Sequence, residues 1–111
     1  MPAIPKSDWK AFCNRVSKGL EGKRAEIAVA SLRLGAQVEG EWLPLLGIAY
    51  DDKDDLFEVA LEGLDHLVNR PREVHAQEGA TGLESLLVRD ADGTQHLVRF
   101  KEPVMIAPPG A

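Results

Sequence analysis

The chain has 111 residues, with 44% hydrophobic and 28% charged side chains, a composition typical of one globular domain with a modest core. Its longest apolar runs are too short to cross a bilayer, and no basic start followed by an apolar block marks a secretory signal. A single cysteine excludes an intramolecular disulfide and fits a reducing compartment. We therefore expect residues 1–111 to form a single cytoplasmic domain without a membrane partner.

The net charge of −5 is unevenly distributed along the chain. The first 35 residues carry seven Lys/Arg against three Asp/Glu, and the remainder carries six against fifteen. A protein that binds nucleic acid in general needs a basic face to neutralise phosphates, so this balance argues against a nucleic-acid partner. It also allows the basic N-terminal segment to dock on the acidic remainder, within one chain or in a dimer.

The N-terminal region predicts an extended arm followed by a helix. Two prolines make residues 1–6 an arm, and Ser7 is a credible N-cap for a helix over residues 7–20. The apolar residues of this helix form one stripe at helical spacing. They are Trp9, Phe12, Cys13, Val16 and Leu20.

Residues 24–100 alternate in the manner of antiparallel β-structure. We expect a first strand over residues 24–34 and a second over Gln37–Trp42, interrupted at Pro44. Residues 43–64 then predict the clearest hairpin, with Asp51–Asp55 as its solvated turn. In the expected register Tyr50 pairs with Asp55, Ile48 with Phe57, and Leu46 with Val59. That register places one apolar set on the buried face: Leu46, Ile48, Tyr50, Phe57, Val59 and Leu61.

The second half of the chain predicts shorter strands. Residues 66–68 and 73–77 are extended pieces separated by Asn69-Arg70-Pro71. A final hairpin turns about Asp90–Gly93, with Gly93 left-handed, and pairs Leu86 with Val98 and Val88 with His96. Residues 103–111 are a Pro-rich tail. The fold class is therefore α+β: an N-terminal amphipathic helix on a strongly bent antiparallel sheet, or a small SH3-like barrel, of six to seven short strands.

Three features invite a test for metal or catalytic chemistry. The turn Asp51–Asp55 lacks the spaced ligands and central glycine of a calcium loop, and we interpret it as solvated. His66, His75 and His96 could meet on adjacent strands and bind zinc or share protons, but no short-spaced His or Cys pair supports this, so separate histidines are favoured. Cys13 lies on the apolar stripe and should pack rather than react.

No residue pattern marks a catalytic constellation. No serine lies in a nucleophile elbow, and no pair of carboxylates is set apart for acid–base work. We expect no catalytic residue, no metal and no cofactor, and we favour a protein that is not an enzyme over one that is. The best candidates for a binding surface are His66, Arg70 and Arg72, because the stretch that holds them could bind an anion or an acidic segment. Trp42 is a further candidate, since an exposed tryptophan often anchors an interface.

Several blocks together resemble a known family. WLPLLGIAYDDKDD, LEGLDHLVNRPREV and DADGTQHLVRFKEP, preceded by Trp9-x-x-Phe12 and by Gly35-Ala36-Gln37-Val38-Glu39, are similar to a family of small uncharacterised bacterial proteins catalogued as a domain of unknown function. The resemblance spans residues 4–108. It implies a stand-alone bacterial, cytoplasmic protein, and it carries over no activity, cofactor or catalytic residue.

The sequence thus supports two hypotheses. The first is a non-catalytic domain that works by binding, through self-association as a homodimer or through a protein partner. The second is a small-ligand or anion-binding protein, or an enzyme of an unrecognised type, that uses His66, Arg70 and Arg72.

Overall fold

The computed structural model describes residues 3–33 and 35–108. One short helix precedes seven strands. The elements are a 3₁₀ turn (Lys6–Asp8), α1 (Trp9–Ser17), β1 (Arg24–Ser31), β2 (Gly35–Asp51), β3 (Leu56–Leu61), β4 (Leu64–Asn69), β5 (Pro71–Gly79), β6 (Gly82–Asp90) and β7 (Gln95–Val104).

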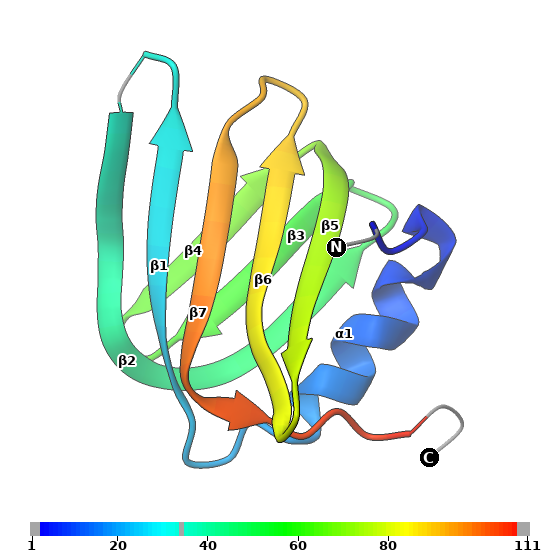
Figure 1. Cartoon of the computed structure of the whole chain (residues 1–111). Coiled ribbons are helices and arrows are strands. Elements are labelled where there is room, and N and C mark those ends of the chain that lie inside the picture. The colour runs from blue at the N-terminus through cyan, green and yellow to red at the C-terminus, as the bar shows by residue number, and fades with distance from the viewer. Residues whose placement is uncertain (1–2, 34, 109–111) are drawn as a thin grey trace.

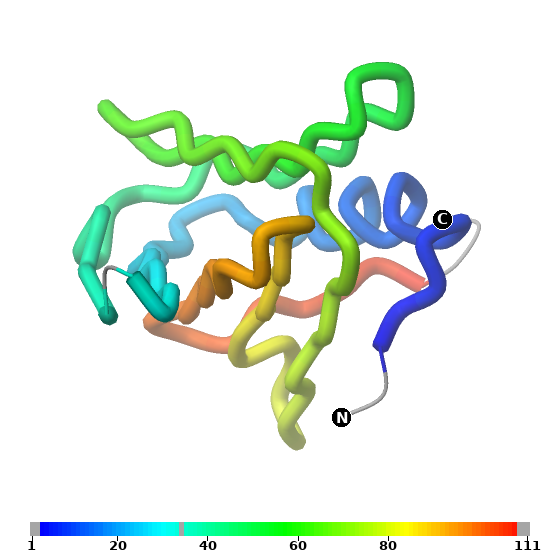
Figure 2. The backbone as a smooth tube through the Cα atoms, turned by 90° about the horizontal axis from the view of Figure 1, so that it is seen from above, coloured from blue at the N-terminus to red at the C-terminus, as the bar shows by residue number. Residues whose placement is uncertain are grey.

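All strand neighbours are antiparallel, in the order β4-β3-β2-β1-β7-β6-β5. The long strand β2 belongs to two layers. Its first half pairs with β1 in a front layer with β7, β6 and β5, and its second half pairs with β3 in a back layer with β4 (Figure 1). Seen from above, the back layer runs across the front layer with space for a core between them (Figure 2). The predicted bent antiparallel sheet is confirmed, whereas a closed barrel is not formed.

The bend in β2 has a local cause in its backbone. Trp42 has a left-handed φ of 52°, which a bulky L-residue rarely adopts, and register shifts in the pairing with β1 lie beside it. Pro44 follows this bend, and the strand continues through it because Pro44 still pairs with Arg24. The expected interruption at Pro44 was therefore wrong. An irregular, sharply bent strand tolerates a proline that a flat central strand would reject.

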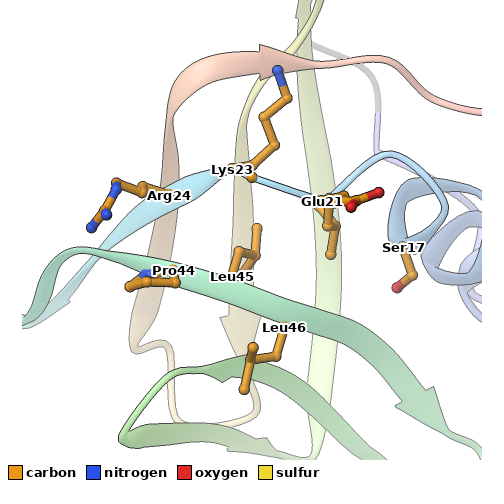
Figure 3. Close-up of a pocket in the computed structure, with 9 residues that line it drawn as sticks. Ser17, Glu21, Lys23, Arg24, Pro44, Leu45 and Leu46 are labelled. Carbon is orange, nitrogen blue, oxygen red and sulfur yellow. The ribbon is translucent and has the colours of Figure 1, made fainter.

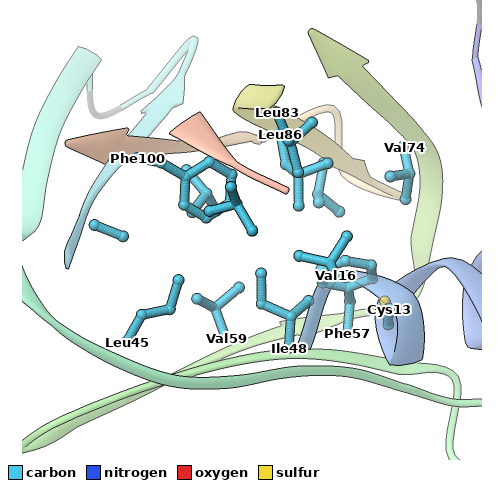
Figure 4. Packing of buried hydrophobic residues seen from close by; sticks show 14 of the residues in the cluster. Cys13, Val16, Leu45, Ile48, Phe57, Val59, Val74, Leu83, Leu86 and Phe100 are labelled. Atoms are coloured by element: carbon cyan, nitrogen blue, oxygen red, sulfur yellow. The ribbon is translucent and has the colours of Figure 1, made fainter. Parts of the chain in front are cut away.

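The core lies between the two layers and beneath α1. Val16 of the helix lies among side chains from both layers, including Ile48 and Phe57 of the back layer (Figure 4). Trp9 is only 1% exposed, stacks edge-on against Tyr50 at 5.1 Å, and donates its indole N–H to the Ile4 carbonyl at 2.9 Å. These contacts close one side of the sandwich with apolar surface.

The helix is shorter than its sequence suggests. α1 begins at Trp9, after the 3₁₀ turn, and no side chain caps its first turn, so the expected N-cap at Ser7 was wrong. The expected apolar stripe is confirmed, because Trp9, Phe12, Cys13, Val16 and Leu20 are all buried. Burial raises the pKa of the Cys13 thiol to about 12, so the thiol stays protonated within the core.

The central hairpin forms, but its pairing is displaced by two residues. Tyr50 pairs with Phe57 and Ile48 with Val59, so Asp51 and Leu56 close the turn. An even displacement keeps every side chain on its face, and the buried set is confirmed at all positions except Leu46. A bulge between Leu45 and Gly47 turns Leu46 outward, where it is 66% exposed, and buries Leu45 instead.

Two other expectations are confirmed. The final hairpin pairs Leu86 with Val98 and Val88 with His96, and Gly93 has φ +83°. The basic N-terminal segment docks on the acidic turn within the same chain, through Lys6 and Asp55 at 3.1 Å and Lys10 and Asp52 at 3.9 Å.

Candidate functional site

A histidine pair joins the two layers where β4 meets β7. His96 is an inward-facing residue of the front layer, flanked by Val29 of β1 and Val88 of β6. His66 lies beside Val59 in the back layer. Nε2 of His66 lies 2.9 Å from Nδ1 of His96. The interpretation of separate histidines was therefore wrong for these two.

The third histidine does not join the pair. His75 lies on β5, where its Nε2 contacts Oε1 of Glu73 at 3.0 Å. Its register partner in β6 is the half-exposed Leu87, on the face opposite the buried Val74 and Val88. His75 therefore lies on the outer side of the front layer, away from the space between the layers.

Asp90 fixes the proton arrangement of the histidine pair. Its Oδ2 lies 3.0 Å from Nε2 of His96, and its Oδ1 accepts the backbone N–H groups of Asp92 and Thr94. An ionised carboxylate only accepts, so Nε2 of a neutral His96 carries the hydrogen and its Nδ1 presents a lone pair. Nε2–H of His66 must then donate to that lone pair. The result is a directed chain, Asp90–His96–His66.

The surroundings favour a neutral His66. Burial and the neighbouring His96 lower the pKa of His66, and Glu39 of β2 partly opposes them. Burial alone would raise the pKa of Asp90, but hydrogen bonds from His96 and from the backbone N–H groups of Thr94 and Asp92 hold it below its usual value. The carboxylate therefore stays ionised as the anchor of the chain.

The geometry of the histidine pair suits one shared hydrogen between the two rings rather than a bound metal ion. The ring centroids are 5.1 Å apart, so the 2.9 Å nitrogen–nitrogen line runs almost straight from one ring to the other. Within residues 3–33 and 35–108, no group of three His, Cys, Asp or Glu side chains is placed to hold a metal. The arrangement can hold and pass a proton.

The predicted Arg70 and Arg72 do not converge on His66. Arg70 forms a corner between β4 and β5 with a left-handed φ of 51°. Its backbone N–H donates to the Asp55 carbonyl, and its backbone carbonyl accepts a hydrogen bond from the N–H of Ala91. Its guanidinium reaches the exposed Asp92 at 3.5 Å. Arg72 is exposed and acts electrostatically on Asp55. Binding of an anion or an acidic segment at His66, Arg70 and Arg72 stays a prediction. The structure does not bring these three side chains together.

Trp42 lies elsewhere again, half-buried at the bend of β2. It lines a shallow hollow of about 410 Å³ with the exposed Gln77, Arg99 and Lys101 on the outer side of the front layer. Arg24 donates to its carbonyl at 3.2 Å. Its role as an interface anchor also stays a prediction.

A second hollow, of about 480 Å³, lies between the end of α1 and β2 (Figure 3). Its cationic residues do not converge: Lys23 extends toward β7, where it contacts Glu102 at 3.8 Å, and Arg24 points away from it. The floor is formed by Leu45, beside the exposed Leu46. This hollow gathers no group of polar side chains around a common point.

The strand edges differ sharply in how they are protected. The edge strand β5 is covered by the N-terminal arm, because Ala3 bridges to His75 and the N–H of Ile4 donates to Val74 at 2.8 Å. The edge strand β4 has six residues. The first half of β2 pairs only with β1, and residues 35–39 are all exposed. It is therefore the longest uncovered edge among the described strands.

Apolar side chains accompany this open edge. Val38 is 58% exposed on β2, and Leu32 is fully exposed beside the β1–β2 turn. In Figure 1 this part of β2 forms the lateral border of the front layer, and no other element lies beyond it. An unpaired strand edge with exposed apolar residues nearby is a template for another strand.

Both features carried only weak sequence signals. Asp90 and His96 lie six residues apart around the Asp90–Gly93 turn, so the predicted register, which sets His96 against Val88, brings them near each other. The partner His66 comes from the other layer, and only the three-dimensional packing reveals it. The open edge depends on β2 changing partners at its bend, which the expected break at Pro44 concealed.

No helix among the described residues is long and apolar enough to cross a membrane. No solved structure matches the chain. An uncharacterised protein from Aquifex aeolicus (strain VF5) is 37% identical over 103 residues, which cover 92% of this chain and 93% of that protein. The model of the family of unknown function DUF5335 matches residues 1–109. The chain therefore belongs to the DUF5335 family.

Proposed function

We propose that the protein is a non-catalytic binding module that self-associates through the open first half of β2. The observation that carries this proposal is the contrast among the strand edges. The arm covers β5 at Val74 and His75, and β4 has six residues, whereas β2 is paired on one side only from Gly35 to Pro44, with residues 35–39 exposed. In an antiparallel ladder, alternate residues turn their backbone N–H and C=O groups to opposite sides, so half of these groups face solvent. A second strand would satisfy them.

The charges favour a second copy of this chain as that strand. In an antiparallel pair centred on Val38, Gln37 lies opposite the second copy's Glu39, and Gly35 opposite its Glu41. No like charges then face each other, and Arg33 at the tip lies near the second copy's Glu41. Centring the pair on Glu39 would instead oppose two glutamates. The charges thus disfavour that register and permit a two-fold symmetric edge contact.

Side chains would add to the backbone contact. The exposed Val38 residues would meet on the outer side of the joined sheets, and Leu32 of each copy would lie near the end of the shared ladder. Burying these apolar groups stabilises the contact by about 25 cal/mol for each Å² removed from water. Partner choice would therefore depend on both the edge and its two apolar residues.

Sedimentation velocity across a wide range of protein concentration tests the proposal. We expect the native chain to form dimers and Val38→Lys to remain monomeric, because a lysine on an edge strand opposes pairing. Leu67→Lys is the matched control, since Leu67 is also exposed on an edge strand, β4, and this variant should still dimerise. A native chain that stays monomeric at the highest concentration, or equal loss of dimer in both variants, contradicts the proposal.

Binding of an anion at His66, Arg70 and Arg72 has weaker support. Arg70 already contacts Asp92, and His66 donates to His96, so these side chains do not present one common binding point. Thermal-shift screening of simple anions with the native chain and with Arg72→Gln would reveal such a site as a rise in melting temperature that the variant loses.

A further inference from the structure

We propose that His66 and His96 form a proton-operated latch, which holds β4 against the front layer when the pair carries at most one extra proton and releases it when a second enters. This inference does not depend on self-association. It concerns the way in which the back layer is fastened, and it follows from the single hydrogen that the contact can hold.

The geometry sets the limit of one hydrogen between the rings. With both rings neutral, Nε2–H of His66 donates to Nδ1 of His96 across 2.9 Å. When one proton is added, either ring is the cation, and one hydrogen still lies between the two nitrogens. When both rings are cations, each facing nitrogen carries a hydrogen, and two donors cannot occupy that distance. The rings must then separate.

The charged neighbours make the first proton easier to accept than the second. Asp90 of β6 faces Nε2 of His96, and Glu39 of β2 acts on His66. On the remaining flanking strands, the register neighbours are apolar: Val29 on β1 and Val59 on β3. The Asp90 carboxylate in contact with His96 stabilises one positive charge on the pair, whereas burial and the charge of His96 outweigh the effect of Glu39 on His66 and oppose a second.

Separation of the rings would act on β4 in particular. β4 is an end strand of the sheet order and pairs with β3 alone, so it has fewer backbone partners than the central strands. Its inward-facing side chains are few: Val68 is buried and His66 and Leu64 are half-buried, whereas Asp65, Leu67 and Asn69 are exposed. Loss of the histidine contact therefore removes a large share of what fastens this strand to the front layer.

The direction of the pH effect follows from proton linkage. Burial and His96 lower the pKa of His66 below the unfolded value of about 6.5. The opened state then binds more protons than the closed state at mildly acidic pH. Closing therefore becomes less favourable as the pH falls from the unfolded pKa of about 6.5 through the lower pKa of His66 in the closed state. If opening takes up one proton, the opening equilibrium changes by at most about tenfold for each pH unit.

Hydrogen exchange of the β4 amides, corrected for the intrinsic exchange rate, tests the latch in the full chain. We expect the protection of residues 64–69 in the native chain to fall by up to about tenfold per pH unit below pH of about 6.5, more than that of β1 or β7. His66→Gln keeps an amide N–H that can donate to His96 but does not titrate, so its β4 protection should not depend on pH. His66→Phe provides a second non-titrating variant.

His75→Gln is the matched control, because it is the same substitution outside the contact between the layers. It should retain the native pH dependence. The latch is overturned if β4 protection in the native chain does not change with pH, or if His66→Gln and His66→Phe keep the native dependence. It is also overturned if protection falls equally in all strands.

Discussion

On the side of α1, Trp9, Phe12 and Val16 insert between the two layers, whereas at the meeting of β4 and β7 the layers touch through His66 and His96. The helix side is closed by apolar surface, whose contribution to stability does not depend on protonation. The histidine contact is a directed hydrogen bond that survives only while one hydrogen lies between the rings. One domain thus combines a permanent closure with a conditional one.

The largest expected effect is on the helix side. Trp9→Ala should lower the free energy of unfolding by about 3–5 kcal/mol, because it removes a fully buried indole, its stacking on Tyr50 and its hydrogen bond to Ile4. Urea unfolding measures this loss. Lys10→Ala, in the same helix but exposed, should change it by less than about 0.5 kcal/mol. Similar effects from both substitutions would contradict the apolar closure.

A smaller effect is expected at the anchor of the histidine chain. Asp90→Ala leaves the N–H of the buried His96 without its acceptor, and should cost about 1–3 kcal/mol in the same measurement. Asp92→Ala is the control in the same turn. Its carboxylate is exposed and forms an ion pair with the exposed Arg70, so the expected loss is at most about 1 kcal/mol. Equal losses would remove Asp90 from its anchoring role.

The smallest effect tests the bulge in β2 that exposes Leu46 and buries its neighbour Leu45. Leu46→Lys should change the free energy of unfolding by less than about 0.5 kcal/mol, because Leu46 is exposed. Leu45→Lys should prevent stable folding, since it would bury an unpaired charge beneath the bend. The register expected from sequence predicts the reverse order for the two variants, so thermal unfolding of the pair decides between them.

The sequence predicted the parts of the fold that follow from local periodicity. The apolar stripe of α1, the inward set of the central hairpin and the register of the last hairpin follow from spacings of 3.6 and 2 residues. It failed where one residue changes the local geometry. The left-handed backbone of Trp42 and the bulge at Leu45–Gly47 carry no such periodicity, and they decide where β2 bends and which leucine is buried.

The candidate sites required information that no single segment contains. His66 and His96 are 30 residues apart and come from different layers, so their contact depends on how the layers stack. The open edge depends on which strands end the sheet. Arg70 and Arg72 suggested a site through nearness in sequence to His66, yet Arg70 serves as a corner and points to Asp92. Nearness along a strand does not bring side chains to one point.

The measurement that tests self-association most directly is hydrogen exchange of the native chain at two protein concentrations. Pairing of the open edge predicts that amides within residues 35–41 gain protection at the higher concentration, while those of β4 do not. Unchanged exchange in residues 35–41 at a concentration where sedimentation detects dimers would contradict the account, because the dimer would then use another surface.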